Sequence, residues 1–238
     1  LLSYKPSRVS FVKKLLYFTV SSVIQSSIIR KVAMALSGIF LIVFLLQHFI
    51  INITSVFSES IFNQFSHFMG TNFVVQFIAQ PILIFGVMFH FIMGFILDFK
   101  NRRSRNIKYV KFKGSSNSSW MSRNMIISGL VVLSFLGLHF YDFAIPEMNY
   151  KYVEFLPDDP NRYYTELTHK FEDIIKVIIY VISFGFLSLH LLHGFSSSFQ
   201  SIGVNNKYNS ILKLIANIYA IGIPLGFSFI AIFHYLNN

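Results

Sequence analysis

The chain has 238 residues, of which 54% are hydrophobic and only 13% charged, and its mean hydropathy is +0.57. A soluble domain of this length would carry roughly a quarter charged residues, so this composition excludes an ordinary soluble enzyme and indicates a polytopic membrane protein of one domain. The absence of cysteine excludes disulfides, thiolate zinc sites, thiolate-bound iron–sulfur clusters and covalently attached c-type haem, and the net charge of +10 must be explained by its placement.

The first part of the chain differs from the rest. Residues 9–29 mix apolar and basic positions and lack an A-x-A cleavage site, so we predict that 1–31 is a cytoplasmic amphipathic segment on the inner surface rather than a signal peptide. The remainder, 32–236, is predicted to be an all-α membrane domain, a bundle of five transmembrane helices, because five stretches reach the ~20 apolar residues that a membrane-spanning helix needs. Their bounds are about 32–54, 73–98, 124–145, 174–199 and 211–235.

Lysine and arginine are concentrated on one side of these predicted spans. They precede the first span, fill the connection 99–123 and recur as Lys207 and Lys213, whereas the connection 142–173 is rich in Asp and Glu. The positive-inside rule therefore places the N-terminus and the connection 99–123 in the cytoplasm, and the acidic connection and the C-terminus on the outer side of the membrane. This placement explains the basic charge without nucleic acid, and a basic inner face can also bind an acidic protein partner.

Four histidines lie in four different predicted spans: His48, His90, His139 and His190. An ionisable side chain in the bilayer core is costly and indicates function, and two histidines from two helices are what a six-coordinate haem iron needs. A rise of ~1.5 Å per residue puts His48 and His139 toward the outer face and His90 and His190 toward the inner face. The sequence therefore predicts two b-type haems stacked inside the bundle, separated in depth by roughly 10–15 Å.

Each of these features also has a simpler explanation. A single membrane histidine often links helices or serves a proton path. Gly86 and Gly94 flank His90, and Gly194 follows His190, which suits a planar group close to the backbone but is also common where membrane helices pack tightly. A zinc or di-iron site is disfavoured, because no carboxylate is expected in the membrane core.

Seven stretches of the chain resemble the single-subunit, five-helix diheme cytochrome b of bacterial succinate:menaquinone oxidoreductases and fumarate reductases, most closely its Bacteroidetes-like branch. They are F-L-L-Q-H-F-I-I-N (44–52), F-N-Q-F-S-H-F-M-G (62–70), F-H-F-I-M-G (89–94), S-S-W-M-S-R-N-M (118–125), F-L-G-L-H-F (135–140), L-H-L-L-H-G-F-S-S-S-F-Q (189–200) and the last span with its proline. The order and spacing of the motifs are specific, and the resemblance extends from about 27 to 236. It implies a membrane anchor with two haem b groups that carries electrons between a cytoplasmic iron–sulfur subunit and menaquinone, while a flavoprotein subunit holds the succinate site.

The resemblance also bears on individual residues near the inner face. It aligns His190, rather than the neighbouring His193, with the second inner ligand, and leaves His193 to a propionate or a helix contact. Anionic haem propionates would pair with basic or hydroxyl side chains at this level, although snorkelling charge is the simpler explanation of each. The candidates are Arg30, Lys31, Ser122 and Arg123, of which Arg123 matches the S-R-N of the family motif.

Menaquinone is expected on the outer side, where the resemblance implies quinone chemistry and where the segment 56–70 carries polar groups. The candidate quinone contacts are Asn63, Gln64 and His67, with His67 as the proton carrier. Some relatives have a glutamate in this region, whereas this chain has none between Glu59 and Asp98. The outer-boundary histidines, His169 and His234, are expected to be structural.

The predicted function is therefore that of the anchor subunit of a succinate dehydrogenase (complex II), with the dicarboxylate site on a partner subunit. Fumarate reduction would use the same parts, and the cytochrome b of a hydrogenase or formate dehydrogenase is the runner-up. A transporter with a histidine relay fits less well, because the sequence shows no internal repeat and only Pro224, between Gly222 and Gly226, as a strong kink. Assembly of heterotrimers into an oligomer is left open.

Overall fold

The computed structural model describes residues 26–103, 124–204 and 209–237, which are almost entirely helical and contain no strand. Five helices in these ranges are long and apolar enough to cross a membrane, as the sequence predicted. They are α2 (Ser27–Phe57), η1 with α4 (Val75–Ala79, Gln80–Arg103), α7 with η2 and α8 (Met125–His139, Phe140–Ala144, Ile145–Tyr152), α10 (Ile174–Ser201) and α11 (Asn209–Asn237). The shorter helices are α3 (Glu59–Thr71) and α9 (Arg162–Lys170).

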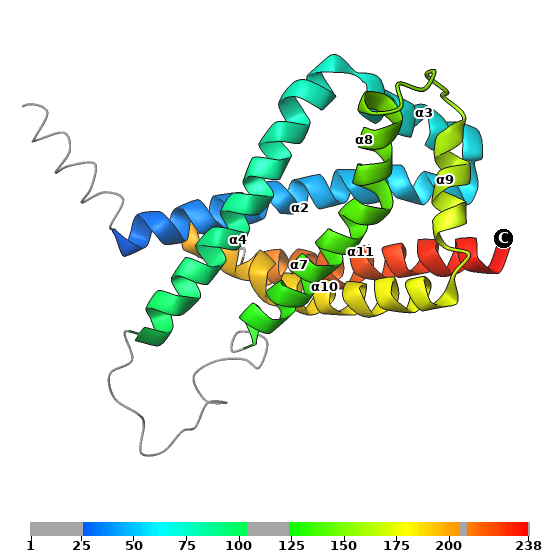
Figure 1. Cartoon of the computed structure of the whole chain (residues 1–238). Helices are drawn as coiled ribbons and strands as arrows, with labels where there is room; N and C mark the ends of the chain where they lie inside the picture. Colours follow the sequence, from blue (N-terminus) through cyan, green and yellow to red (C-terminus); the bar gives the residue numbers. More distant parts are fainter. Residues whose placement is uncertain (1–25, 104–123, 205–208, 238) are drawn as a thin grey trace, which may run out of the picture.

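Three of the long helices run alongside one another. Helix α10 packs along α11, and α2 packs on both of them. Helix α4 contacts α2 and helix α7 contacts α10, and both cross the other three at a steep angle (Figure 1). The shorter helices α3, α8 and α9 close one end of this bundle (Figure 1). Each of the four histidine-bearing helices therefore has a face toward the interior of the bundle.

The outer surface of the bundle is as apolar as its interior. Large side chains such as Val43, Phe85 and Leu225 are each more than 60% exposed. Helices that are apolar on all sides suit a lipid bilayer, in which exposing apolar side chains costs no free energy. The tightest core lies toward the end covered by α3 and α9, and Phe62, Phe171, Phe184, Phe227 and Ile230 belong to it.

The structure differs from the predicted elements at the start of the first span and in the segment that follows it. Helix α2 begins at Ser27, so residues 27–31 belong to the first long helix rather than to a separate surface segment; residues 1–25 of that prediction lie outside the described residues. The outer segment 56–70, for which no helix was predicted, is largely helix α3. The Ser58 hydroxyl caps this helix by accepting a hydrogen bond from the Ile61 N–H at 3.3 Å.

Proline explains two irregular turns in the long helices. The π-helical turn η1 comes directly before Gln80 and Pro81, and η2 comes directly before Ile145 and Pro146. Proline lacks an N–H and its ring collides with the carbonyl four residues earlier, and a wider turn relieves that collision while the helix continues. The turn η2 also follows His139 directly, so one of the four histidines lies beside an irregular turn.

Gly226 of α11 marks a close approach to α2. A Cβ atom at Gly226 would lie 2.3 Å from Cε2 of Phe49, whereas one at Gly222 would meet no described atom within 4 Å. The Phe49 ring already packs edge to face on Phe227, with ring centroids 5.3 Å apart. We expect Gly226→Ala to lower the free energy of unfolding by about 1–3 kcal/mol, because the Phe49 ring must move. Thermal unfolding in detergent measures this change, and Gly222→Ala is the matched control, expected to be neutral or stabilising; equal losses in the two variants would contradict the close contact.

Candidate functional site

The structure brings the four membrane histidines together as two pairs. His48 of α2 and His139 at the end of α7 have ring centroids 5.8 Å apart, with their planes at 83°. His90 of α4 and His190 of α10 have ring centroids 6.4 Å apart, with their planes at 71°. All four side chains are half-buried between helices. These are the same partners that depth counting matched from the sequence.

The spacing within each pair suits two axial ligands of one iron. An imidazole nitrogen binds a first-row metal at about 2.0 Å, so rings on opposite sides of one iron have centroids about 6 Å apart. Both measured separations, 5.8 and 6.4 Å, lie close to that value. A haem iron takes only these two ligands from the protein, because the porphyrin supplies four more. The residues present therefore fit a bis-histidine haem at each pair.

Each inner histidine meets a serine on a neighbouring helix. The Ser37 hydroxyl oxygen lies 3.0 Å from Nδ1 of His90, and the Ser128 hydroxyl oxygen lies 3.3 Å from Nδ1 of His190. Each hydroxyl donates its own hydrogen to the backbone carbonyl three residues earlier, at Met34 (2.8 Å) and Met125 (2.9 Å). With that hydrogen already used, each serine oxygen accepts from Nδ1–H of its histidine. Nε2 of both rings is thereby left with a lone pair for a metal.

A glycine lies beside each ring of the inner pair, at a distance where an added Cβ would be in ordinary van der Waals contact with the ring. A Cβ atom at Gly38 would lie 3.4 Å from Cε1 of His90, and one at Gly129 would lie 3.5 Å from Cε1 of His190. Four residues after each histidine stands another glycine, whose Cβ would lie 3.6 Å (Gly94) or 3.3 Å (Gly194) from the Cε of a methionine. Those methionines are Met34 and Met125, the residues whose carbonyls accept from the two serines. The same arrangement therefore occurs twice.

This duplication is visible in the sequence, and the prediction that there is no internal repeat was wrong. Residues 34–48 of α2 and 125–139 of α7 align without a gap, with six identical positions in fifteen. Those positions are Met34/Met125, Ser37/Ser128, Gly38/Gly129, Phe44/Phe135, Leu45/Leu136 and His48/His139. Helices α4 and α10 align in the same way. Their shared residues are Ile82/Ile182, His90/His190, Gly94/Gly194, Phe95/Phe195 and Phe99/Phe199.

The outer pair has related but unequal surroundings. Each ring stacks on the phenylalanine four residues earlier: Phe44 with His48 at 5.6 Å and Phe135 with His139 at 5.8 Å between centroids. The Asn52 amide lies 3.3 Å from Nδ1 of His48. Nδ1 of His139 is buried and has no hydrogen-bond partner among the described residues. No serine bonds to either outer ring in these parts of the chain, which distinguishes the outer pair from the inner pair.

Asp142 is a buried acid that the sequence analysis placed in the outer connection. Its side chain is 2% exposed and lies in η2, three residues beyond His139. Its carboxylate accepts hydrogen bonds from Lys176 Nζ at 2.9 Å and from the Tyr180 hydroxyl at 2.8 Å. Asp142 also lines an outward-facing pocket of about 360 Å³ together with Glu166 and His169. The wide π turn carries this carboxylate into the bundle.

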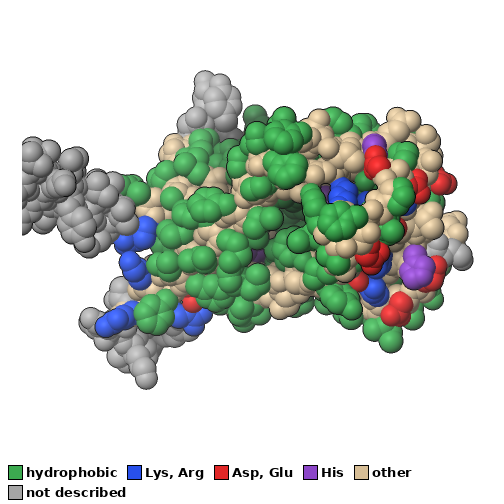
Figure 2. Space-filling view, turned by 45° about the horizontal axis from the view of Figure 1, so that its top comes forward, with side chains coloured by type: hydrophobic (Ala, Val, Ile, Leu, Met, Phe, Trp, Pro, Cys, Tyr) green, Lys and Arg blue, Asp and Glu red, His purple; other side chains and the backbone are tan. Residues whose placement is uncertain are grey.

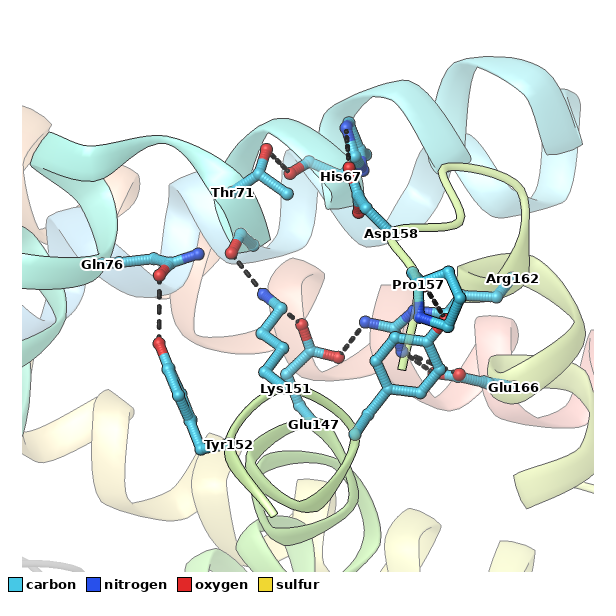
Figure 3. A network of polar contacts seen from close by, with 12 residues as sticks. His67, Thr71, Gln76, Glu147, Lys151, Tyr152, Pro157, Asp158, Arg162 and Glu166 are labelled. Atoms are coloured by element: carbon cyan, nitrogen blue, oxygen red, sulfur yellow. Dashed lines mark hydrogen bonds and ion pairs between the residues drawn. The ribbon is translucent and has the colours of Figure 1, made fainter. Parts of the chain in front are cut away.

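A polar network joins the shorter outer helices (Figure 3). Arg162 of α9 pairs with Glu147 of α8 and with Glu166 of its own helix, and its guanidinium lies 4.0 Å from the ring centroid of Tyr150. Lys151 of α8 donates to the backbone carbonyl of Gly70 at the end of α3. Burial opposes the charge of Arg162, but hydrogen bonds to Glu166 and Glu147 and their charges outweigh it and raise the pKa of this guanidinium. An ion pair therefore joins α8 to α9, and a hydrogen bond joins α8 to α3.

The three predicted quinone contacts lie on α3 but have different partners. Asn63 is buried, with its oxygen accepting from the Tyr164 N–H at 2.7 Å and its amide donating to the Asn161 carbonyl at 3.1 Å. Gln64 is exposed. Nε2 of His67 lies 3.6 Å from a carboxylate oxygen of Asp158, as Figure 3 shows. Asn63 thus serves as a link between α3 and α9, and the three side chains do not converge on one space.

Three of the remaining predicted site residues lie toward the opposite end. Arg30 is half-buried and Lys31 is exposed at the start of α2, and His193 is half-buried on α10; Ser122 and Arg123 lie outside the described residues. In Figure 2 most acidic side chains of that face lie at one end, where some lysines and arginines lie among them, and further lysines and arginines lie at the other end. His234, expected to be structural, is 1% exposed and lies 2.9 Å from the Ser55 hydroxyl, which fits that expectation.

Comparison of the chain with models of protein families, with curated proteins and with solved structures finds no match. The two histidine pairs, the apolar helices around them and the motif resemblance are therefore the features that bear on function.

Proposed function

We propose that this chain is the diheme cytochrome b anchor subunit of a succinate dehydrogenase (complex II). The observation that supports this proposal best is the presence of two histidine pairs, each with the ring separation of a bis-histidine iron, inside a bundle of five apolar helices. The motif resemblance supports the choice of complex II among respiratory cytochromes. The proposed haem ligands are His48 with His139 and His90 with His190.

The chain's own residues account for the separation of the two sites. Ser37 contacts the inner pair and His48 belongs to the outer pair. The number of residues between them on α2 therefore sets the distance between the two pairs. The step from residue 37 to residue 48 corresponds to about 16 Å along the helix. When bound, each haem supplies one-electron redox chemistry. The histidines would hold the two irons, the serines would orient the inner rings, and the surrounding phenylalanines would exclude water.

The charge distribution supports the proposed partners and orientation. Basic residues gather at the end where α2 begins and α4 ends, which suits a cytoplasmic face in the inner membrane of a bacterium. There the chain would bind the iron–sulfur subunit and, with it, the flavoprotein subunit. Menaquinone would exchange electrons at the opposite end, nearer to the outer pair and His67.

A haem assay of the purified chain tests this proposal. We expect two haem b groups per chain by pyridine haemochrome, co-purification of flavin and iron–sulfur subunits from the native host, and reduction of both haems by succinate in that complex. Absence of haem would overturn the cytochrome assignment. Haem without succinate-dependent reduction, or with hydrogenase or formate dehydrogenase subunits instead, would overturn the assignment to complex II.

A further inference from the structure

We propose that Ser37 and Ser128 are positioning residues that lower the reduction potential of the inner haem by accepting hydrogen bonds from its two histidine ligands. This inference rests on the proposed function, because it requires a haem between His90 and His190. It goes further by assigning a role to two serines that lie on α2 and α7, whereas the ligands of the inner haem lie on α4 and α10.

The hydrogen-bond directions determine which nitrogen of each inner histidine holds the proton. Each serine donates to the carbonyl of the methionine three residues earlier, so its oxygen is free only to accept. The proton between serine and histidine must then reside on Nδ1 of the ring. Both rings are fixed in the tautomer that presents Nε2 to a metal, and neither can rotate without losing this bond.

The duplicated segments place both serines at the same kind of contact. Ser37 and Ser128 occupy equivalent places in the two copies of the Met-x-x-Ser-Gly segment, and each is followed by a glycine that lies beside the histidine ring. Both are buried, at 9% and 7% exposure, so neither faces lipid. Their occurrence at the same contact with a histidine ring in both copies indicates a role at the ring itself.

Ligand chemistry gives the direction of the effect. A histidine that donates its second N–H to an acceptor becomes a more basic ligand. A more basic ligand stabilises the ferric iron more than the ferrous iron, which lowers the reduction potential. The outer pair lacks this serine contact within the described residues, so the effect is confined to the inner haem.

The two serines are not expected to contribute equally. The Ser37 contact is shorter, at 3.0 Å against 3.3 Å for Ser128. Replacing Ser37 should therefore shift the inner haem more than replacing Ser128.

A redox titration of the assembled complex, monitored optically and by electron paramagnetic resonance, tests the inference. We expect Ser37→Ala to raise the midpoint of the inner haem by up to a tenfold change in its reduction equilibrium, about 59 mV for one electron. Ser128→Ala should cause a smaller rise, and the outer haem should not move in either variant. Ser37→Thr, which keeps the hydroxyl, should restore the native midpoint.

Ser134 provides the matched control. It lies on the same helix as Ser128 and donates to the Leu130 carbonyl at 3.0 Å, but it is exposed and bonds to no histidine. Ser134→Ala should leave both midpoints unchanged. An unchanged inner midpoint in Ser37→Ala, with two haems still bound, would overturn the inference and leave the proposed function intact. Loss of haem from the native chain itself would instead overturn the proposed function.

Discussion

Under the proposed function, replacing His90 or His190 with alanine should reduce the haem content from two groups per chain to one, whereas replacing His193 should leave both. The inner iron needs both rings, since a single imidazole leaves its sixth position without a protein ligand. His190 faces His90 at 6.4 Å, bonds to Ser128 and shares the His-x-x-x-Gly spacing of His90. His193 lies nearly one helical turn further on and has no counterpart in the copy on α4. Pyridine haemochrome per chain and the low-spin resonance signals measure the result.

The control for this experiment is His169→Ala. His169 is exposed on α9, outside the long helices, and its loss should change neither haem content nor spectra. Loss of a haem in His193→Ala, with His190→Ala still holding two, would show that the wrong histidine of the two has been assigned. Full haem content in both His90→Ala and His190→Ala would contradict the assignment of an inner haem site to these two histidines.

Replacing Asp142 with alanine will strongly destabilise the protein. The carboxylate is buried, and its loss leaves the Lys176 ammonium and the Tyr180 hydroxyl without their shared acceptor. Removing one partner of a fully buried ion pair costs about 3–5 kcal/mol. Lys176 is 26% exposed and keeps some contact with water, so we expect a smaller loss of about 2–3 kcal/mol, with the unsatisfied Tyr180 hydroxyl included. The apparent midpoint of thermal unfolding in detergent should fall accordingly, and the midpoint of Asp142→Asn, which keeps an acceptor for Tyr180, should fall less.

Asp98 supplies the comparison for Asp142. It forms an ion pair with Arg102 at 2.7 Å, one turn away on α4, in an exposed setting. Such pairs contribute about 0–1 kcal/mol, so Asp98→Ala should unfold close to the native temperature. A loss of stability in Asp142→Ala no larger than in Asp98→Ala would show that the buried pair contributes little.

Much of the fold followed from the sequence, because hydropathy over some twenty residues is a strong signal. The fourth span was predicted at 174–199 and is Ile174–Ser201, and the second was predicted at 73–98 and is Val75–Arg103. The third ends seven residues later than predicted, at Tyr152, because Pro146 does not stop the helix: the π turn before it accommodates the ring. Helix α3 was missed because it has only 13 residues and mixes polar with apolar side chains, so it gives no hydropathy signal of the kind that marks a membrane span.

The candidate site was predicted only in part. Depth counting matched His48 with His139 and His90 with His190, since a helix rises by a constant amount per residue. The serines behind the inner rings could not be found in that way, because Ser37 and His90 lie 53 positions apart and only packing brings them together. A comparison of residues 34–48 with 125–139 would have shown them. Asp142 was assigned to the outer connection because a charged residue near the end of a span is typical of a loop. In the structure it lies in η2 and is paired with Lys176.

The duplicated helix pairs have a consequence for how the protein is made. Helices α2 and α4 form one copy, and α7 and α10 form the other. Every histidine pair takes one ring from each copy, so neither half of the polypeptide contains a complete site. While a ribosome has delivered only the first copy to the membrane, His48 and His90 have no opposite rings. Under the proposed function, the His48–His139 site would be complete once α7 is inserted and the His90–His190 site only once α10 is inserted, and each bound haem would then join the early half of the chain to the late half.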